Sequence, residues 1–272
     1  MKEIKTFIVD SFTDKPFSGN PAGVCIVNEQ LSDTQMLNIA KELGLSETAF
    51  VKANQNEGFA YSIRYFSPKM EIPLCGHATL ASAKILFTIN TSLQNIDFTT
   101  VENIVLSIEK VGHQIRMTFP VYNTSPANAP APLLAALGIK SIVNSAYNAE
   151  TNILLLEIDD SELLSNLKPD FSALYKSHQD INGVLVTAPS SKIDFDFESR
   201  YFWPWSGTDE DPVTGGTHTF LAKYWSERFN KTKMNSFQCS ERSGFMTVEL
   251  INDSEMTITS QAQIILEGKL FI

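Results

Sequence analysis

The sequence has few cysteines, few histidines and a deficit of basic residues, and each shortage excludes a class of protein. Its three cysteines, Cys25, Cys75 and Cys239, are too far apart for a disulfide framework or a Cys-x-x-Cys metal site. The four histidines also lack paired ligand spacing, so we expect no metal site unless the fold assembles one. With 21 basic and 31 acidic residues the formal net charge is −10, which argues against nucleic acid as a partner, because phosphate binding depends on Lys and Arg.

Long hydrophobic runs are absent as well. No apolar run approaches the ~18 residues that a membrane-spanning helix needs, and the N-terminus enters a strand-like segment without a signal-peptide core. We therefore expect a cytoplasmic protein with no membrane partner. Hydrophobic residues make up 43% of the 272 residues and charged residues 19%, which is typical of globular proteins, and the length suits two domains of roughly 130 residues.

What the sequence does contain is one short motif in two unequal copies. Glu71-Ile-Pro-Leu-Cys-Gly-His77 is matched by Glu210-Asp-Pro-Val-Thr-Gly-Gly216. An aromatic block precedes each copy, Arg64-Tyr-Phe-Ser-Pro68 in the first and Arg200-Tyr-Phe-Trp-Pro204 in the second. Agreement in two consecutive blocks predicts a duplicated fold with an asymmetric active site.

The first half is predicted to be mostly β, with two helices. Ser32-Asp-Thr-Gln35 has the spacing of a capping box, and Gly44 suits the C-cap of the helix that follows. The segment Ala78 to Phe87 is apolar or small on nearly every side, with Lys84 as its only charge, so we predict a buried helix with a sheet curled around it. The predicted strands are Lys5 to Val9, Val24 to Val27, Leu45 to Val51, Phe59 to Phe66, Ile104 to Ile108 and Gln114 to Phe119.

A segment rich in Pro, Asn and small residues, Pro120 to Pro132, is predicted to be a linker, with the domain boundary between residues 121 and 122. The second half should repeat the central helix at Thr217 to Phe229. Its other predicted helices are Leu133 to Leu137, Glu162 to Leu167 and Phe171 to Ser177, and its predicted strands are Asn152 to Ile158, Gly183 to Thr187, Phe245 to Ile251 and Met256 to Ser260.

The strongest catalytic candidate, Glu47, lies outside the duplicated motif. In a strand over Leu45 to Val51, the period of two places Glu47 on the apolar face. Burial raises a carboxyl pKa toward neutrality, which suits a proton-transfer catalyst. The alternative is an edge strand in which Glu47 is solvated.

In the first copy of the motif, Cys75, Gly76 and His77 stand where the buried helix begins. Backbone N–H groups and the positive end of the helix dipole favour anions there, so a carboxylate substrate would suit the site. His77 is a candidate proton donor, or a histidine satisfied by a backbone carbonyl. Cys75 is a candidate nucleophile or acid/base, although a small buried hydrophobe is the commoner role of a free cysteine.

In the second copy, Asp211 replaces Ile72 and Thr214 replaces Cys75. Asp211 is a candidate for substrate binding or a simple turn cap. Gly215, Gly216 and Thr217 offer backbone donors at the second helix start, or form a ligand-free turn. A further candidate is Asn20, either a ligand-facing amide or the turn residue of an Asn-Pro pair.

Several blocks together resemble the PhzF family of phenazine-biosynthesis-like proteins. The resemblance covers nearly the whole chain and is carried by Asp10-Ser-Phe-Thr13, Ser18-Gly-Asn-Pro-Ala-Gly-Val24, Leu45-Ser-Glu-Thr-Ala-Phe50, Cys75-Gly-His-Ala-Thr79, Glu210-Asp-Pro-Val-Thr-Gly215, Gln238-Cys-Ser-Glu-Arg242 and Glu267-Gly-Lys-Leu270. It implies the α+β diaminopimelate-epimerase-like fold, with two similar halves, each a curled sheet around a central helix, and an active site in the cleft between them. It also implies that residues after about Gln261 return to the first half, and that the protein forms a homodimer.

The same resemblance implies roles for three residues. In the phenazine enzyme the glutamate matching Glu47 moves a proton between ring carbons of a dihydro-hydroxyanthranilate, without cofactor or metal, and the residues matching His77 and Asp211 line the site. Epimerases of this fold use two cysteines, and Thr214 in place of the second disfavours that mechanism. The sequence departs from the family at Gly216, where the phenazine enzyme has a serine, and at Arg242-Ser-Gly244 in place of Arg-Gly-Gly.

We therefore predict a cofactor-independent isomerase that acts on a small carboxylate metabolite. Glu47 relays the proton, His77 and Asp211 position or polarise the substrate, and backbone amides near Gly76 and Gly216 hold its carboxylate. One alternative is a racemase or epimerase that uses Cys75, alone or with Glu47. The other is a non-catalytic module that binds a metabolite or a protein on the same scaffold.

Overall fold

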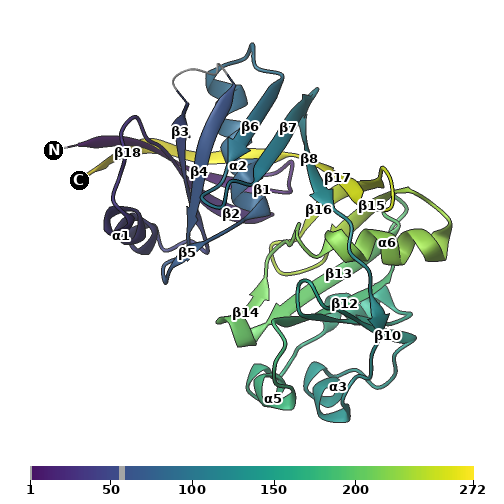
Figure 1. Cartoon of the computed structure of the whole chain (residues 1–272). Helices are drawn as coiled ribbons and strands as arrows, with labels where there is room; N and C mark the ends of the chain where they lie inside the picture. The colour runs from purple at the N-terminus through teal and green to yellow at the C-terminus, as the bar shows by residue number, and fades with distance from the viewer. Residues whose placement is uncertain (1, 55–58) are drawn as a thin grey trace. The chain divides into compact units, whose positions relative to one another are not determined.

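The computed structural model describes residues 2–54 and 59–272, and the chain divides into two compact units. Unit 1 comprises Met1–Thr118 and Ile258–Ile272, and unit 2 comprises Phe119–Thr257 (Figure 1). Within the described ranges, no helix combines the length and the apolar content that crossing a membrane would require.

Unit 1 is a curled sheet that surrounds one helix, α2 (Gly76–Ile89), as Figure 1 shows. Ten of the 14 residues of α2 are buried, and they include the small residues Ala78, Ala81, Ser82 and Ala83, which allow the strands to approach closely. The prediction of a buried central helix is thus confirmed. The strands are β1 (Glu3–Ser11), β2 (Asn20–Ile26), β3 (Thr48–Ala53), β4 (Ala60–Phe66), β5 (Glu71–Ile72), β6 (Asn95–Thr99), β7 (Val105–Val111), β8 (Gln114–Pro120) and the last strand of the chain, β18 (Ala262–Phe271), which pairs with β1.

Helix α1 (Asp33–Leu43) packs on the outer face of this sheet. Its start has the predicted capping box between Ser32 and Gln35, and its end has Gly44 in the left-handed conformation at φ 64°. Both features were predicted from the sequence and are confirmed. The buried face of the helix, Met36, Ile39 and Ala40, belongs to a cluster with Phe50 and Phe66 of the sheet.

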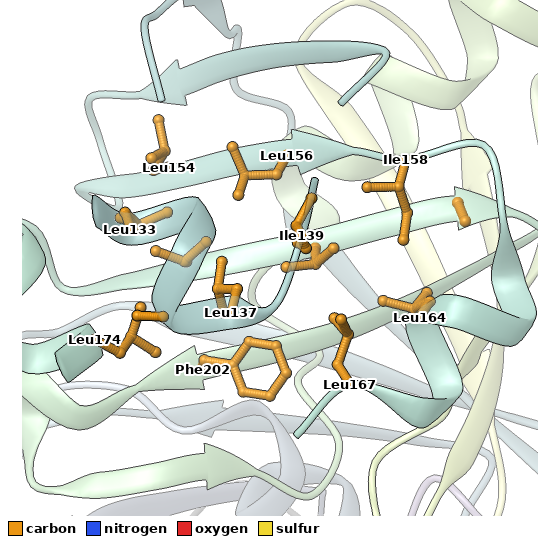
Figure 2. Close-up of a cluster of buried hydrophobic side chains, with 14 of the residues drawn as sticks. Leu133, Leu137, Ile139, Leu154, Leu156, Ile158, Leu164, Leu167, Leu174 and Phe202 are labelled. Carbon is orange, nitrogen blue, oxygen red and sulfur yellow. The ribbon is translucent and has the colours of Figure 1, made fainter. Parts of the chain in front are cut away.

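Unit 2 has the same organisation with a larger set of outer helices. Its central helix is α6 (His218–Phe229). The strands are β9 (Ser125–Pro126), β10 (Asn144–Asn148), β11 (Ile153–Glu157), β12 (Gly183–Pro189), β13 (Phe197–Trp203), β14 (Thr208–Asp211), β15 (Lys233–Gln238), β16 (Gly244–Leu250) and β17 (Glu255–Ser260). The outer helices are α3 (Ala131–Leu137), α4 (Ser161–Asn166) and α5 (Phe171–Ser177), with a 3-10 turn at Pro204–Ser206. These helices bury leucines against β11 and against Phe202 of β13 (Figure 2).

The strand pairings establish the duplication. In unit 1, β1–β2, β3–β4, β4–β5 and β6–β7 are antiparallel, whereas β2–β3 and β4–β6 are parallel. In unit 2, β10–β11, β12–β13, β13–β14 and β15–β16 are antiparallel, whereas β11–β12 and β13–β15 are parallel. Strands β1 to β7 and β10 to β16 therefore follow one topology, as the repeated motif predicted.

Two sequence predictions are corrected by the structure. The segment Pro120 to Pro132 is not a free linker: the Tyr122 N–H donates to the Thr219 carbonyl at 2.8 Å, β9 pairs with β10, and α3 begins at Ala131. The strand predicted over Leu45 to Val51 begins only at Thr48. The sequence did not predict strands β6, β10, β13 and β15.

Candidate functional site

An Arg–Glu ion pair frames each copy of the duplicated motif. In unit 1, Arg64 on β4 donates from Nε and Nη2 to the two carboxylate oxygens of Glu71 on β5, at 2.7 and 2.6 Å. In unit 2, Arg200 on β13 holds Glu210 on β14 in the same way, at 2.8 and 2.7 Å. A bidentate guanidinium–carboxylate pair fixes geometry as well as charge. Each pair therefore secures the hairpin whose chain continues into the central helix.

The start of α2 is held by buried hydroxyl groups. The Thr79 hydroxyl donates to the Cys75 carbonyl at 2.7 Å and lies 2.6 Å from the Tyr65 hydroxyl. The Ser11 hydroxyl on β1 donates to the His77 carbonyl at 2.7 Å. These bonds tie the first turn of the helix to strands β1 and β4, so the side chains of Cys75 and His77 start from a rigid backbone.

Glu47 faces this helix start. It lies immediately before β3, and its carbonyl accepts the Gly23 N–H of β2 at 3.0 Å. Its Oε2 is 3.1 Å from Nε2 of His77, and the two side chains are only 12% and 10% exposed. The carboxylate is therefore shielded, as predicted, but its partner is an imidazole and not the apolar face of a strand.

The pair with His77 reverses the expected pKa shift of Glu47. Burial alone would raise the pKa of the Glu47 carboxyl, but the hydrogen bond and charge of His77, with a contribution from Ser46, lower it below its ordinary value. For His77, burial opposes protonation, yet the contacts with Cys75 and Glu47 raise its pKa well above the ordinary value. The contact therefore favours the charged form of each group, a carboxylate at Glu47 and an imidazolium at His77.

Cys75 lies on the other side of the imidazole. Its Sγ is 3.4 Å from Nδ1 and 3.9 Å from Nε2 of His77, and the residue is 7% exposed. Burial raises the pKa of the Cys75 thiol. Among the described residues, the carboxylate, thiol and imidazole of Glu47, Cys75 and His77 form a group whose ligand atoms lie within 4.8 Å of one another and could hold a metal ion. The spacing of Cys and His along the sequence did not predict this grouping, because the fold assembles it.

Glu47 has no acidic counterpart in unit 2. In the register, Thr48 pairs with Phe66 in β3–β4 and Val184 pairs with Phe202 in β12–β13, where Phe66 and Phe202 are equivalent positions of the aromatic block. Position 183, a glycine, is therefore the counterpart of Glu47. The asymmetry that the sequence predicted for the motif therefore extends to the position of Glu47.

Asp211 is fixed at the end of β14 by its neighbours. Its carboxylate accepts the Thr214 hydroxyl. Its carbonyl accepts Nε2 of Gln238 at 2.7 Å and the Ser240 hydroxyl at 3.3 Å, while Oε1 of Gln238 accepts the Thr214 N–H at 2.8 Å. Gln238, which is 1% exposed, thus braces the turn from residue 211 to residue 214. The sequence analysis assigned no role to Gln238. Its position in a segment that resembles the PhzF family, together with its polar side chain, could have identified it as a candidate.

The start of α6 contains a second buried histidine that the sequence reading did not select. Nδ1 of His218 donates to the Thr214 carbonyl at 3.0 Å, and Nε2 accepts from the Ser236 hydroxyl at 2.7 Å. Burial lowers the pKa of His218 to about 4, so the ring is neutral. Thr217, the N-cap residue, donates its hydroxyl to the same Thr214 carbonyl at 3.1 Å. A Cβ at Gly216 would meet no atom within 4 Å, so the position has room for a side chain.

The predicted site residues therefore fall into two groups. Asn20, the fully buried first residue of β2, pairs with Ser11, whose hydroxyl binds the His77 carbonyl. Unit 1 contains Asn20, Glu47, Cys75, Gly76 and His77, and it brings the side chains of Glu47, Cys75 and His77 into contact. Unit 2 contains the others, namely Asp211, Gly215, Gly216 and Thr217.

Comparison with known proteins agrees with these features. A family model described as phenazine biosynthesis-like protein matches residues 9–268. An uncharacterised isomerase of Halalkalibacterium halodurans is 38% identical over 269 residues, which are 98% of each chain. A crystal structure from Enterococcus faecalis, described as a phenazine biosynthesis protein of the PhzF family, covers 100% of both chains with a TM-score of 0.92 and 34% identity.

A more distant solved structure supports the fold alone. A predicted epimerase from Pseudomonas aeruginosa is 19% identical and covers 99% of both chains with a TM-score of 0.75. The doubled strand topology, the two central helices and these matches lead to one conclusion: the chain belongs to the phenazine biosynthesis-like, or PhzF, family.

Proposed function

We propose that this protein is a cofactor-independent isomerase that moves a proton between two positions of a small carboxylate metabolite, with Glu47 as the proton carrier. The observation that carries the proposal is the shielded contact of 3.1 Å between Glu47 Oε2 and His77 Nε2 at the start of a buried helix. The relative from H. halodurans, which matches over nearly its whole length, is named an isomerase.

The charge states of the pair suit this chemistry. Because the pKa of Glu47 is lowered, the group enters the reaction as a carboxylate and accepts a proton from a carbon of the substrate. It then delivers the same proton to a second carbon, so the electron pair of the broken C–H bond moves through the substrate and no external oxidant or reductant is required. The imidazolium of His77 offsets the negative charge that develops on the substrate.

Substrate binding is assigned to backbone donors and to Asp211. Gly76 is the first residue of α2, where backbone N–H groups and the helix dipole favour a carboxylate. In unit 2, Asp211 and the amides near Gly216 are assigned to the polar groups of the substrate. The hydroxyl that the phenazine enzyme has at the position of Gly216 is missing, so a substrate other than the phenazine precursor is proposed.

The test is isotope exchange in deuterated water. Candidate carboxylates are incubated with the protein and analysed by mass spectrometry for deuterium incorporation. Glu47→Gln, which keeps the shape but removes the base, should lower incorporation by about 100-fold or more. Glu42→Gln on α1, an exposed glutamate, is the matched control. If Glu47→Gln exchanges as fast as the unaltered protein, the role of Glu47 is refuted, and tight binding without exchange would instead support a non-catalytic metabolite-binding module.

One observation favours a second candidate, a racemase that uses Cys75. The Cys75 sulfur is 3.4 Å from Nδ1 of His77, and a protonated imidazole at that distance would stabilise the thiolate that removes the substrate proton. Under this alternative, Cys75→Ala abolishes inversion of a stereocentre. Under the proposed isomerase mechanism, Cys75→Ala leaves most of the Glu47-dependent exchange in place.

A further inference from the structure

Three potential metal ligands meet at the start of α2. Oε2 of Glu47 is 3.1 Å from Nε2 of His77, Sγ of Cys75 is 3.9 Å from the same nitrogen, and all three ligand atoms lie within 4.8 Å of one another. They come from two segments that are far apart in the sequence, the residue before β3 and the first turn of α2.

The spacing of these atoms is close to that of a tetrahedral zinc site. Zinc bonds of about 2.3 Å to sulfur and about 2.0 to 2.1 Å to nitrogen or oxygen require ligand atoms about 3.3 Å apart for N and O and about 3.6 Å apart for N and S. The observed 3.1 and 3.9 Å are within about 0.3 Å of these values. The remaining edge, between Glu47 Oε2 and Cys75 Sγ, is no longer than 4.8 Å and must shorten when the ion binds.

The donor set selects a class of ion. Thiolate and imidazole ligands suit zinc and similar transition metals, whereas magnesium and calcium prefer oxygen ligands only. Three protein ligands leave a fourth position open. The side chains of Glu47 and His77 remain 12% and 10% exposed, so the cluster is shielded but not sealed from solvent.

From this geometry we propose that Glu47, Cys75 and His77 form a binding site for Zn²⁺, and that the bound ion inhibits the protein. On binding, the Cys75 thiol and the His77 imidazolium release their protons to solvent, and the ion takes the carboxylate lone pair of Glu47 that would otherwise accept the proton of the substrate. The binding stands on the geometry alone, whereas the inhibition rests on the proposed function.

Titration of the untagged, chelator-treated full chain with Co²⁺ tests the binding. Cobalt takes the zinc geometry and gives a thiolate-to-cobalt absorption band. One equivalent should saturate this band, and Zn²⁺ should abolish it by displacement. Cys75→Ser should remove the band, and Glu47→Gln should weaken cobalt binding at least about tenfold while the band remains. Cys239→Ser, which removes a cysteine of unit 2 that is not fully buried, is the control that keeps the band.

Absence of the band at saturating Co²⁺, or its persistence in Cys75→Ser, overturns the site. If Cys75→Ser does not fold, the weakened binding of Glu47→Gln decides in its place. Deuterium exchange then separates the two proposals. A protein that binds cobalt but shows no exchange in the metal-free form refutes the isomerase alone. Exchange without cobalt binding refutes the metal site alone, and exchange that continues at saturating Zn²⁺ refutes the inhibition.

Discussion

The buried His218 makes unit 2 sensitive to acid. Its ring is fully buried and neutral, with Nδ1 donating to the Thr214 carbonyl and Nε2 accepting from Ser236. The pKa is about 4 in the folded protein, against an ordinary 6.5. The folded state therefore binds the proton more weakly than the unfolded state. The stabilisation is fully present above pH 6.5 and is lost as the pH falls from 6.5 toward 4.

The size of the effect follows from the two pKa values. By proton linkage, His218 should reduce the free energy of unfolding of unit 2 by about 2 kcal/mol between pH 7.5 and pH 5. The comparison ends at pH 5, because most carboxylates titrate below that pH and would add their own contribution to the change in stability. His218→Gln removes the titrating group, so this part of the pH dependence should vanish although the variant is less stable at every pH.

Tryptophan fluorescence is the appropriate assay, because all three tryptophans, Trp203, Trp205 and Trp225, belong to unit 2. Trp225 stacks on Phe197, which lies 6.0 Å from the His218 ring between centroids, so the signal originates beside the perturbation. Urea unfolding is measured at pH 7.5 and pH 5 for the unaltered protein, for His218→Gln and for the control His178→Gln. If the unaltered protein and His218→Gln lose the same free energy over this interval, the reasoning is refuted.

Three further predictions concern stability, each measured by urea unfolding and calorimetry. Arg200→Lys should lower the free energy of unfolding by about 3 kcal/mol, because Nη1 of Arg200 also donates to the Leu167 carbonyl at 2.8 Å. Arg64→Lys, in the more exposed ion pair, should lower it by about 1 kcal/mol. Equal losses in the two variants would contradict this argument. Gly216→Ser should change the free energy of unfolding by less than about 0.5 kcal/mol, because its Cβ meets no atom within 4 Å, and a large loss would show that the turn is more confined. Gly19→Ala should lower the free energy of unfolding by about 3 kcal/mol or more, because φ is +69° and the new Cβ would lie 2.1 Å from the Ser11 carbonyl oxygen. Gly44→Ala, at φ +64° with no atom near the new Cβ, should lower it by about 1 kcal/mol. Similar losses in the two variants would refute the steric argument.

The outcome of the sequence predictions depended on how local their signals were. The capping box at Ser32, the C-cap at Gly44 and the buried helix after Cys75 each depend on residues that are close together in the sequence. All three are present in the structure. Strand β13 was missed although it contains Arg200, because all its residues but Trp203 are buried and it shows no polar/apolar alternation. Strand β18, with its mixed burial, is defined by its pairing with β1 at the other end of the chain.

The candidate site divides in the same way. The sequence alone determined the duplication, the unequal motif copies, and Glu47 as the acid to examine. Only the tertiary structure set the ionisation of that acid. Residues 47 and 77 are thirty positions apart, and no sequence periodicity predicts that their side chains meet at 3.1 Å. Burial alone therefore predicted a raised pKa for the Glu47 carboxyl, whereas the contact with His77 lowers it. The bracing of Asp211 by Gln238, and the meeting of Glu47, Cys75 and His77, were likewise decided by folding, because hydrogen bonds and electrostatic interactions depend on distance in space, which sequence patterns of two to four residues do not encode.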